Sequence, residues 1–194
     1  MTFRRIVIAM SGASGAGYGL ELIKGLRGLK RKDLHLSVIY NETSSSILDR
    51  ETGTSIEEIE VLCDELAESK QMDHELASGS NPFDALVICP CSTSTASKVH
   101  AGISDNLTTR CASVALKERR KLVLVVRETP LSTPVLRSLF ELSSWGAIVM
   151  PASPPFYDLG SDSIRELQRV FSGRVMDILG IDNDNAIRYS PEKR

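Results

Sequence analysis

The chain has 194 residues, of which 42% are hydrophobic and 25% charged, the balance of an ordinary globular domain with a full core. Its 23 Lys and Arg residues against 25 Asp and Glu residues give a net charge of −2, which excludes the strong basic excess of a nucleic-acid-binding surface. No apolar run approaches the roughly 20 residues of a membrane span, and the run after Arg5 is too short for a signal peptide. We therefore predict one domain over residues 1–194, located in the cytoplasm, with no nucleic-acid or membrane partner.

Short apolar runs alternate with longer amphipathic ones along the chain. The pattern predicts strands over 5–10, 34–40, 85–89, 122–126 and 147–150. Helices are predicted from the glycine-rich turn at 11–19 toward residue 29, and over 44–50, 56–66, 95–100, 107–118, 136–142 and 163–179. The last helix has Asp162 as its expected N-cap and Gly180 as its expected C-cap, and the tail from about residue 181 is polar.

This β-α repetition with buried apolar strands predicts an α/β fold, a doubly wound parallel sheet with helices on both faces. Ligands of such folds bind beyond the carboxyl ends of the strands. The loops that follow each strand are therefore where a functional site is expected.

The loop after the first strand reads Ser11-Gly12-Ala13-Ser14-Gly15-Ala16-Gly17 and opens a helix. Free N–H groups and the helix dipole at such a place attract an anion, such as a phosphate group. No Gly-Lys-Ser/Thr follows, and Tyr40-Asn41 stands where a dinucleotide site has an acidic residue. The loop thus favours a mononucleotide over NAD, the alternative being a tight strand-to-helix turn without a ligand.

A second loop, Cys91-Ser92-Thr93-Ser94-Thr95, follows the third predicted strand. Its four adjacent hydroxyl groups at a helix start are suited to hydrogen bonds with a phosphate. The alternative is that one of them only caps the helix. Both loops are expected to open onto the same edge of the sheet.

Charged residues farther along point to a second anion. Arg110 and Lys117 lie seven residues apart, on one face of a predicted helix, and Arg127-Glu128 follows the fourth predicted strand. The alternative is a solvated basic helix end, which we expect for Arg119 and Arg120. Cys89-Pro90-Cys91 lacks a second Cys/His pair, so structural thiols are expected and no metal site.

In these loops the sequence resembles the UbiX-type flavin prenyltransferases, from residue 6 to about residue 179. The motifs that carry the resemblance are Gly12-Ala13-Ser14-Gly15, Glu51-Thr52, Cys89-Pro90-Cys91-Ser92-Thr93, Asp105-Asn106-Leu107, Ala115-Leu116-Lys117-Glu118-Arg119-Arg120, Arg127-Glu128-Thr129-Pro130 and Phe156-Tyr157.

The resemblance implies a flavodoxin-like Rossmann fold and a homo-oligomer, typically a dodecamer, with active sites at subunit interfaces. It also implies the reaction: reduced FMN is alkylated by dimethylallyl phosphate at N5, and ring closure at C6 follows. The product is the cofactor of a partner decarboxylase related to UbiD, and no metal is required.

The resemblance also implies roles for individual residues. Ser14 and Glu51 match residues linked to proton movements around N5 and C6, and Glu128 is assigned to catalysis and to the prenyl-phosphate site. Residues expected to hold FMN are Gly12, Ala13, Ser14, Asn41, Ser92, Thr93, Ser94, Thr95 and Arg127. Residues expected at the prenyl-phosphate site are Ser78, Arg110, Lys117, Glu128, Tyr157 and Arg174. Tyr189 stands near a Trp of some relatives.

Two other functions are consistent with parts of this pattern. A flavin-dependent cysteine decarboxylase of the same fold would carry a catalytic His and a Pro-x-Met-Asn stretch, whereas residues 151–157 here read Pro-Ala-Ser-Pro-Pro-Phe-Tyr. A non-catalytic FMN carrier or assembly subunit of an aryl-acid decarboxylase would not need Lys117, Glu128, Tyr157 and Arg174 as a set.

Overall fold

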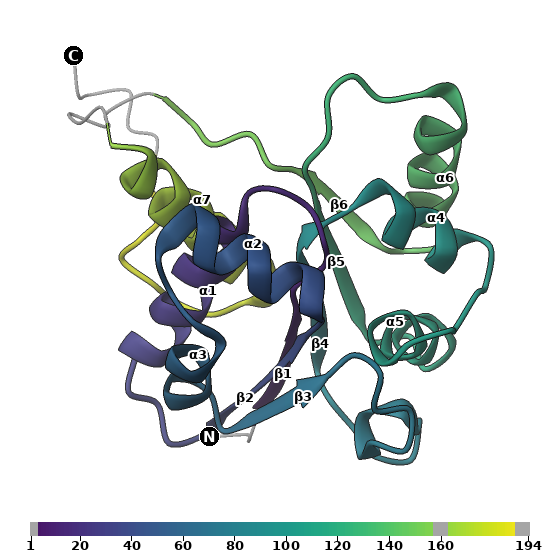
Figure 1. Cartoon of the computed structure of the whole chain (residues 1–194), viewed down its shortest axis with the longest axis horizontal. Helices are drawn as coiled ribbons and strands as arrows, with labels where there is room; N and C mark the ends of the chain where they lie inside the picture. The colour runs from purple at the N-terminus through teal and green to yellow at the C-terminus, as the bar shows by residue number, and fades with distance from the viewer. Residues whose placement is uncertain (1–3, 157–162, 189–194) are drawn as a thin grey trace.

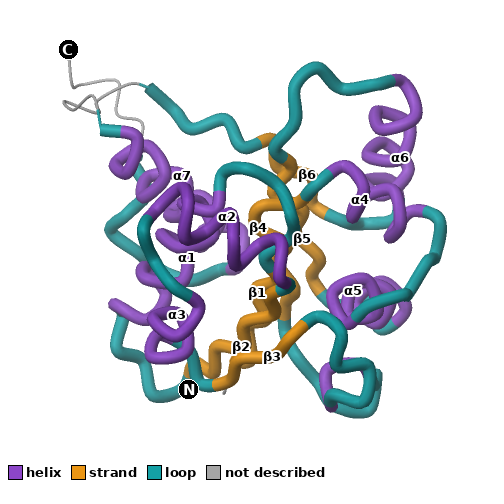
Figure 2. Tube along the Cα trace, viewed as in Figure 1, coloured by secondary structure: helices purple, strands orange, loops and turns teal. Residues whose placement is uncertain are grey.

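A six-stranded, all-parallel sheet forms the centre of the molecule (Figures 1 and 2). The structure, a computed structural model, describes residues 4–156 and 163–188. The strand order across the sheet is β3-β2-β1-β4-β5-β6. The strands are β1 (Arg4–Ala9), β2 (Leu34–Tyr40), β3 (Glu65–Glu68), β4 (Ala85–Cys91), β5 (Lys121–Val126) and β6 (Ile148–Pro151).

Helices cover both faces of this sheet (Figure 1). The helices are α1 (Ala16–Gly28), α2 (Glu42–Thr52), α3 (Ile56–Leu62), α4 (Thr93–His100), α5 (Leu107–Lys117), α6 (Thr133–Ser144) and α7 (Ile164–Leu179), with a short 3-10 turn η1 (Glu75–Ala77). Alternate strand residues belong to two separate cores. Ile8, Val38 and Val123 pack with α1, α2, α3 and α7, whereas Val7, Ile39 and Leu124 pack with α4, α5 and α6. The predicted doubly wound α/β fold is therefore confirmed.

Helix α1 lies unusually close to its neighbours because of three glycines. A Cβ at Gly19 would overlap the backbone carbonyl of Cys89 in β4, and one at Gly17 would overlap the side chain of Gln168 in α7. At Gly25 it would meet Asn185 and Met176. Helix α1 is thus packed tightly between the sheet and α7, and its N-terminus is held firmly at the edge of the sheet.

The helix ends follow the capping chemistry of their sequences. Asn41, Ser55 and Asn106 each form a capping box at the start of α2, α3 and α5. Gly180 ends α7 with φ 70°, the left-handed conformation that favours glycine, as predicted. The expected N-cap Asp162 lies outside the described residues, and α7 begins after Ser163.

One prediction is wrong: the helix expected over 56–66 ends at Leu62, and residues 65–68 form β3. The Asp64 carboxylate accepts a hydrogen bond from the Leu36 N–H, and the Ser37 hydroxyl donates to the Glu65 carboxylate, at the junction with β2. Without β3, the remaining five strands follow the order 2-1-3-4-5 of flavodoxin-like folds. Strand β3 is therefore an extra edge strand on that fold.

Candidate functional site

The loops after β1 and β4 meet at the carboxyl edge of the sheet. The chain leaves β1 toward β2 and leaves β4 toward β5, on opposite sides, so a crevice is expected between them. Ser11 ties the two loops together: its hydroxyl donates to the Pro90 carbonyl at 2.8 Å and accepts from the Ser92 N–H at 2.8 Å. The structure thus brings the two predicted loops to one place.

The glycine loop needs its glycines for different reasons. Gly15 has φ 99°, a left-handed conformation that residues with a Cβ rarely adopt. At Gly12, a Cβ would lie 2.9 Å from Cγ2 of Thr43, at the start of α2. Ser14 and Gly12 are exposed, whereas Ala13 is 8% exposed and donates its N–H to the Ser11 carbonyl. The loop therefore presents Gly12 and Ser14 outward at the crevice.

Glu51, near the end of α2, places its carboxylate at the N-terminus of α1. Its Oε2 accepts hydrogen bonds from the N–H groups of Gly15 and Ala16, both at 2.8 Å. Burial opposes ionisation of this carboxyl, but hydrogen bonds from the Ser14 side chain and these two amides, with the charge of Arg127, lower its pKa below 4.5. Ser14 and Glu51, predicted as a catalytic pair, do lie together. The same contacts leave these two amides unavailable to a phosphate, contrary to the cradle expected there.

Arg127 connects the end of β5 to the glycine loop. Its Nε donates to the Ser14 carbonyl at 3.0 Å, and its N–H donates to the Cys91 carbonyl at 3.3 Å. Glu128, next in sequence, is exposed and accepts from the Thr129 N–H at 3.0 Å. Arg127 and Glu128 therefore lie at the same edge as Ser14 and Glu51.

The N-terminus of α4 has amides left to donate. The Ser92 hydroxyl accepts from the Thr95 N–H at 3.2 Å and lies 2.9 Å from the Thr95 hydroxyl. The N–H groups of Thr93 and Ser94 have no acceptor among residues 4–156 and 163–188. Ser92 is thus a helix cap, and the helix still offers two amides at its positive end, as an anion site requires.

Asn41 lies at the same edge, at the end of β2. Its side-chain oxygen accepts from the Ser44 N–H at 2.8 Å, and its own N–H donates to the Ser44 hydroxyl. Asn41 is therefore the N-cap of α2, the helix that carries Glu51.

Three of the residues predicted to bind a prenyl phosphate lie elsewhere, along α5 and the segment after η1. Arg110 donates to the Ala77 carbonyl at 2.8 Å, and Lys117 pairs with Glu118. Ser78 follows η1, and a Cβ on its neighbour Gly79 would overlap both charged groups of the Lys117–Glu118 pair. Ser78, Arg110 and Lys117 therefore form one cluster.

The remaining prenyl-phosphate residues are not part of that cluster. Lys117 lies shortly before the start of β5 and Glu128 just after its end, roughly 20 Å along the strand. Arg174 lies on α7, across the sheet from α5, where it pairs with Asp177 at 2.5 Å and lines an open hollow beside Pro151 and Phe171. Tyr157 and Tyr189 lie outside the described residues. One chain thus holds two separate groups of these residues.

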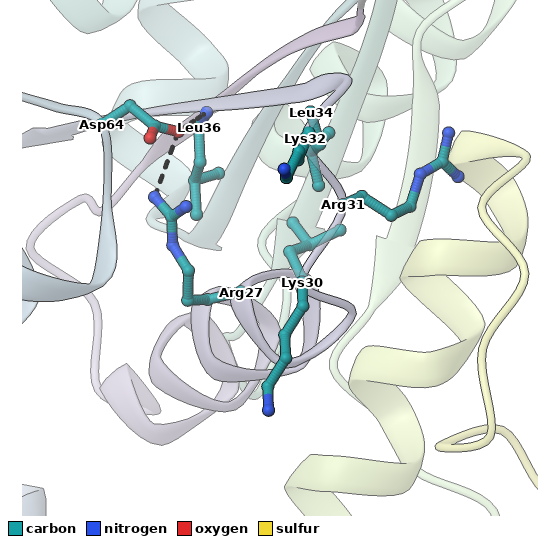
Figure 3. A pocket seen from close by; sticks show the side chains of 8 residues that line it. Arg27, Lys30, Arg31, Lys32, Leu34, Leu36 and Asp64 are labelled. Carbon is teal, nitrogen blue, oxygen red and sulfur yellow. Dashed lines mark hydrogen bonds and ion pairs between the residues drawn. The ribbon is translucent and has the colours of Figure 1, made fainter. Parts of the chain in front are cut away.

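A basic hollow at the opposite edge of the sheet does not fit a phosphate (Figure 3). It lies at the C-terminus of α1, the negative end of the helix dipole. Arg27 pairs there with Asp64 at 3.1 Å, and Arg31 pairs with Asp33 at 2.6 Å. Two of its four cations, Arg27 and Arg31, are thus already paired with neighbouring carboxylates.

The four cysteines are free thiols. A register shift in β4 places Cys89 and Cys91 in the cores on opposite faces of the sheet. Burial raises the thiol pKa of Cys63 to about 11, raises those of Cys91 and Cys111 to about 12, and raises that of Cys89 further. Within the described ranges no three His, Cys, Asp or Glu side chains are grouped as metal ligands, and no helix could cross a membrane.

Comparison with known proteins identifies the family. The Flavoprotein family model matches residues 1–172. A flavin prenyltransferase UbiX from Thermoplasma acidophilum is 42% identical over 185 residues, which cover 95% of this chain and 99% of that protein. The chain belongs to the UbiX flavin prenyltransferase family.

Solved structures agree with this assignment to the UbiX family. AnUbiX (PadA1) in complex with FMN and dimethylallyl pyrophosphate matches with a TM-score of 0.92 and 35% identity, covering 98% of this chain and 99% of that one. A dodecameric FMN-dependent UbiX-like decarboxylase from Escherichia coli O157:H7 matches with a TM-score of 0.91 and 31% identity, covering 96% and 99%. A cysteine decarboxylase, TvaF, is only 16% identical, a likeness of fold alone.

Sequence reasoning missed one residue at the site of this UbiX-family chain. Tyr18 lies one turn after Gly15, where a Cβ would be 3.2 Å from its ring. Its hydroxyl lies 3.4 Å from the Ala152 carbonyl, and its ring packs edge-on against Phe171. Tyr18 thus joins the glycine loop, the segment after β6 and α7. Its i, i+3 spacing from Gly15 was the available signal.

Proposed function

We propose that this chain is a flavin prenyltransferase, which joins the dimethylallyl group of dimethylallyl phosphate to N5 and C6 of reduced FMN. The observation that carries the proposal is the group formed by Ser14, Glu51 and Arg127 beside the free amides of α4. The names of the relatives support the reaction, and the complex of AnUbiX with FMN and dimethylallyl pyrophosphate supports both reactants.

FMN fits the carboxyl edge between β1 and β4. We assign its phosphate to the N-terminus of α4, where the amides of Thr93 and Ser94 and the adjoining hydroxyls of Ser92 and Thr95 can donate. The exposed residues Gly12 and Ser14, with Ala13, Asn41 and Arg127, line the adjacent part of the crevice. When bound, reduced FMN supplies the electron-rich atoms at which the new bonds form.

Glu51 and Ser14 act on protons in this proposal. Because its pKa is lowered, Glu51 is ionised near neutral pH and can accept a proton but not donate one. Two helix amides and the Ser14 side chain fix its orientation. Glu51 therefore serves as the base of the pair, and Ser14 carries the proton between the flavin and Glu51.

The leaving phosphate is held by cations contributed by two copies of the chain. A phosphate monoester carries about −1.5 to −2 charge and is stabilised as it leaves by positive groups. Lys117 lies roughly 20 Å from Glu128 along β5, and Arg174 lies on the other face of the sheet, so these three side chains do not meet within one chain. We therefore place the prenyl site between subunits, with Tyr157 as a further member. The dodecameric relative supports a homo-oligomer, which we propose to be a dodecamer.

The proposal extends to the setting of the enzyme. The family resemblance supports a UbiD-type decarboxylase as the receiver of the prenylated flavin. One sheet formed by strands from residue 4 to residue 151, with α7 packed on it, supports a single FMN-binding domain over 1–194. The four free thiols support a cytoplasmic location.

The proposal is tested by incubating the protein anaerobically with reduced FMN and dimethylallyl phosphate, and in parallel with dimethylallyl diphosphate. A mass spectrum of the extracted flavin is expected to show the gain of one isoprene unit. An FMN carrier would return unchanged flavin, and a cysteine decarboxylase would instead release carbon dioxide from a peptide that ends in cysteine. Comparing the two donors identifies the one that is used.

A further inference from the structure

The segment that carries Ser78 is fastened by three arginines from three parts of the fold. We call residues 75–81 the Ser78 loop. Arg5 of β1 pairs with the Glu75 carboxylate at 2.5 Å, and Arg110 of α5 donates to the Ala77 carbonyl at 2.8 Å. Arg120 donates to two backbone carbonyls that come after Ser78, those of Gly79 and Asn81.

Arg120 has the geometry of a clamp. Its Nη2 lies 2.6 Å from the Gly79 carbonyl and its Nη1 lies 3.2 Å from the Asn81 carbonyl. The guanidinium also stacks over the Phe83 ring, with Cζ 4.7 Å from the centroid, and Phe83 is 3% exposed. The planar fork of an arginine donates to two carbonyls from two separate nitrogens while lying flat on a ring, whereas a lysine offers a single nitrogen in place of that rigid fork. Arg120 is thus not the solvated side chain expected from the sequence.

The hydrogen bonds of Arg120 hold the Ser78 loop beside Lys117. A Cβ on Gly79 would overlap the Lys117 ammonium and the Glu118 carboxylate, so the backbone beside Ser78 lies directly against that ion pair. The Ser78 hydroxyl lies 2.8 Å from the Ser80 hydroxyl within the loop. A shift of the Ser78 loop would therefore change the position of Ser78 relative to Lys117.

We infer that Arg120 is a positioning residue of the prenyl-phosphate site: it holds the Ser78 loop so that Ser78 and Lys117 face one phosphate together. The inference rests on the proposed function. Its hydrogen bonds to Gly79 and Asn81 are to the loop backbone, so Arg120 acts through the loop and not by contact with the donor.

The test compares Arg120→Lys with Arg119→Lys, since Arg119 is the neighbouring, exposed cation. Both variants keep the charge, but only the first removes the fork. Arg120→Lys is expected to raise KM for dimethylallyl phosphate about tenfold or more, the scale of a small misplacement, with FMN affinity unchanged. Hydrogen exchange at amides 75–81 is expected to speed up. Arg119→Lys is expected to leave both quantities at the wild-type values.

A second variant covers the case in which Arg120→Lys fails to fold. Phe83→Leu removes the ring on which the Arg120 guanidinium lies and keeps an apolar side chain there, so it should also raise KM for the donor and speed exchange at amides 75–81. Wild-type KM and wild-type exchange in Arg120→Lys would overturn the inference, as would an equal loss in Arg119→Lys. Wild-type protein that makes no prenylated flavin would instead overturn the proposed function, and the exchange measurement would still decide whether Arg120 holds the loop.

Discussion

Replacing Glu51 separates the charge of its carboxylate from its role as a hydrogen-bond acceptor. Glu51→Gln keeps an oxygen for the amides of Gly15 and Ala16 and loses only the negative charge at the helix N-terminus. That charge is worth about 0.3–1 kcal/mol, at the low end here because Glu51 is exposed. Glu51→Ala also leaves the amide of Ala16, a residue 2% exposed, without its acceptor, which costs about 1–3 kcal/mol.

The dependence on pH checks the same reasoning. The pKa of Glu51 in the folded protein lies below 4.5, so its charge stabilises the fold above that pH and the effect is lost as pH falls through the folded value. The difference in unfolding free energy between wild type and Glu51→Gln, measured in urea, should therefore be present near neutral pH and vanish in acid. At this chain length, 1 kcal/mol corresponds to about 2–4 °C in Tm.

Activity provides the third measurement on these variants. Both variants should retain FMN, because Glu51 lies at the N-terminus of α1 whereas the amides proposed to bind the FMN phosphate lie at α4. Glu51→Gln should nevertheless slow prenylated-flavin formation by roughly 100-fold, the scale of a lost proton-transfer group. Equal destabilisation by Gln and Ala, a stability difference that persists in acid, or normal turnover by Glu51→Gln would each refute the reasoning.

Three further predictions follow from the geometry. Gly19→Ala should destabilise the fold by about 1–3 kcal/mol, because its Cβ would overlap a carbonyl of β4. Gly28→Ala, which has open space around it, should be neutral or stabilising. Urea unfolding of the two variants compares these free energies, and equal effects would contradict the packing argument. Ser14→Ala should keep FMN yet slow product formation about 100-fold, and normal turnover would remove Ser14 from catalysis. Lys117→Ala and Arg174→Ala should each raise KM for dimethylallyl phosphate and leave the affinity for FMN unchanged. Loss of FMN binding would instead mean that these residues belong to the FMN phosphate site.

The sequence predicts the other five strands well and fails at the edge strand β3 for a physical reason. Residues 65–68 read Glu-Leu-Ala-Glu, which has little strand propensity, and Leu66 continues the helical spacing of Ile59 and Leu62. What makes the segment a strand is its pairing with β2, and no local pattern contains that partner. An edge strand of four residues is thus set by tertiary contacts.

The candidate site was predictable wherever a motif follows a strand. The loops that contain Ser14, Ser92 and Arg127 meet as expected, because parallel strands present their carboxyl ends at one edge. The occupation of the α1 amides by Glu51 was not predictable, since it depends on where α2 lies. Nor was the role of Arg120, whose partners are backbone carbonyls about 40 residues earlier.

The raised pKa of every thiol has a consequence for an enzyme that handles reduced flavin. Reduced flavins react with dioxygen to give peroxide, and peroxide attacks the thiolate form of cysteine. With the pKa of Cys63 at about 11 and those of Cys91 and Cys111 at about 12, almost none of that form exists near neutral pH. These cysteines are therefore poor targets for the peroxide that bound reduced flavin would generate in air.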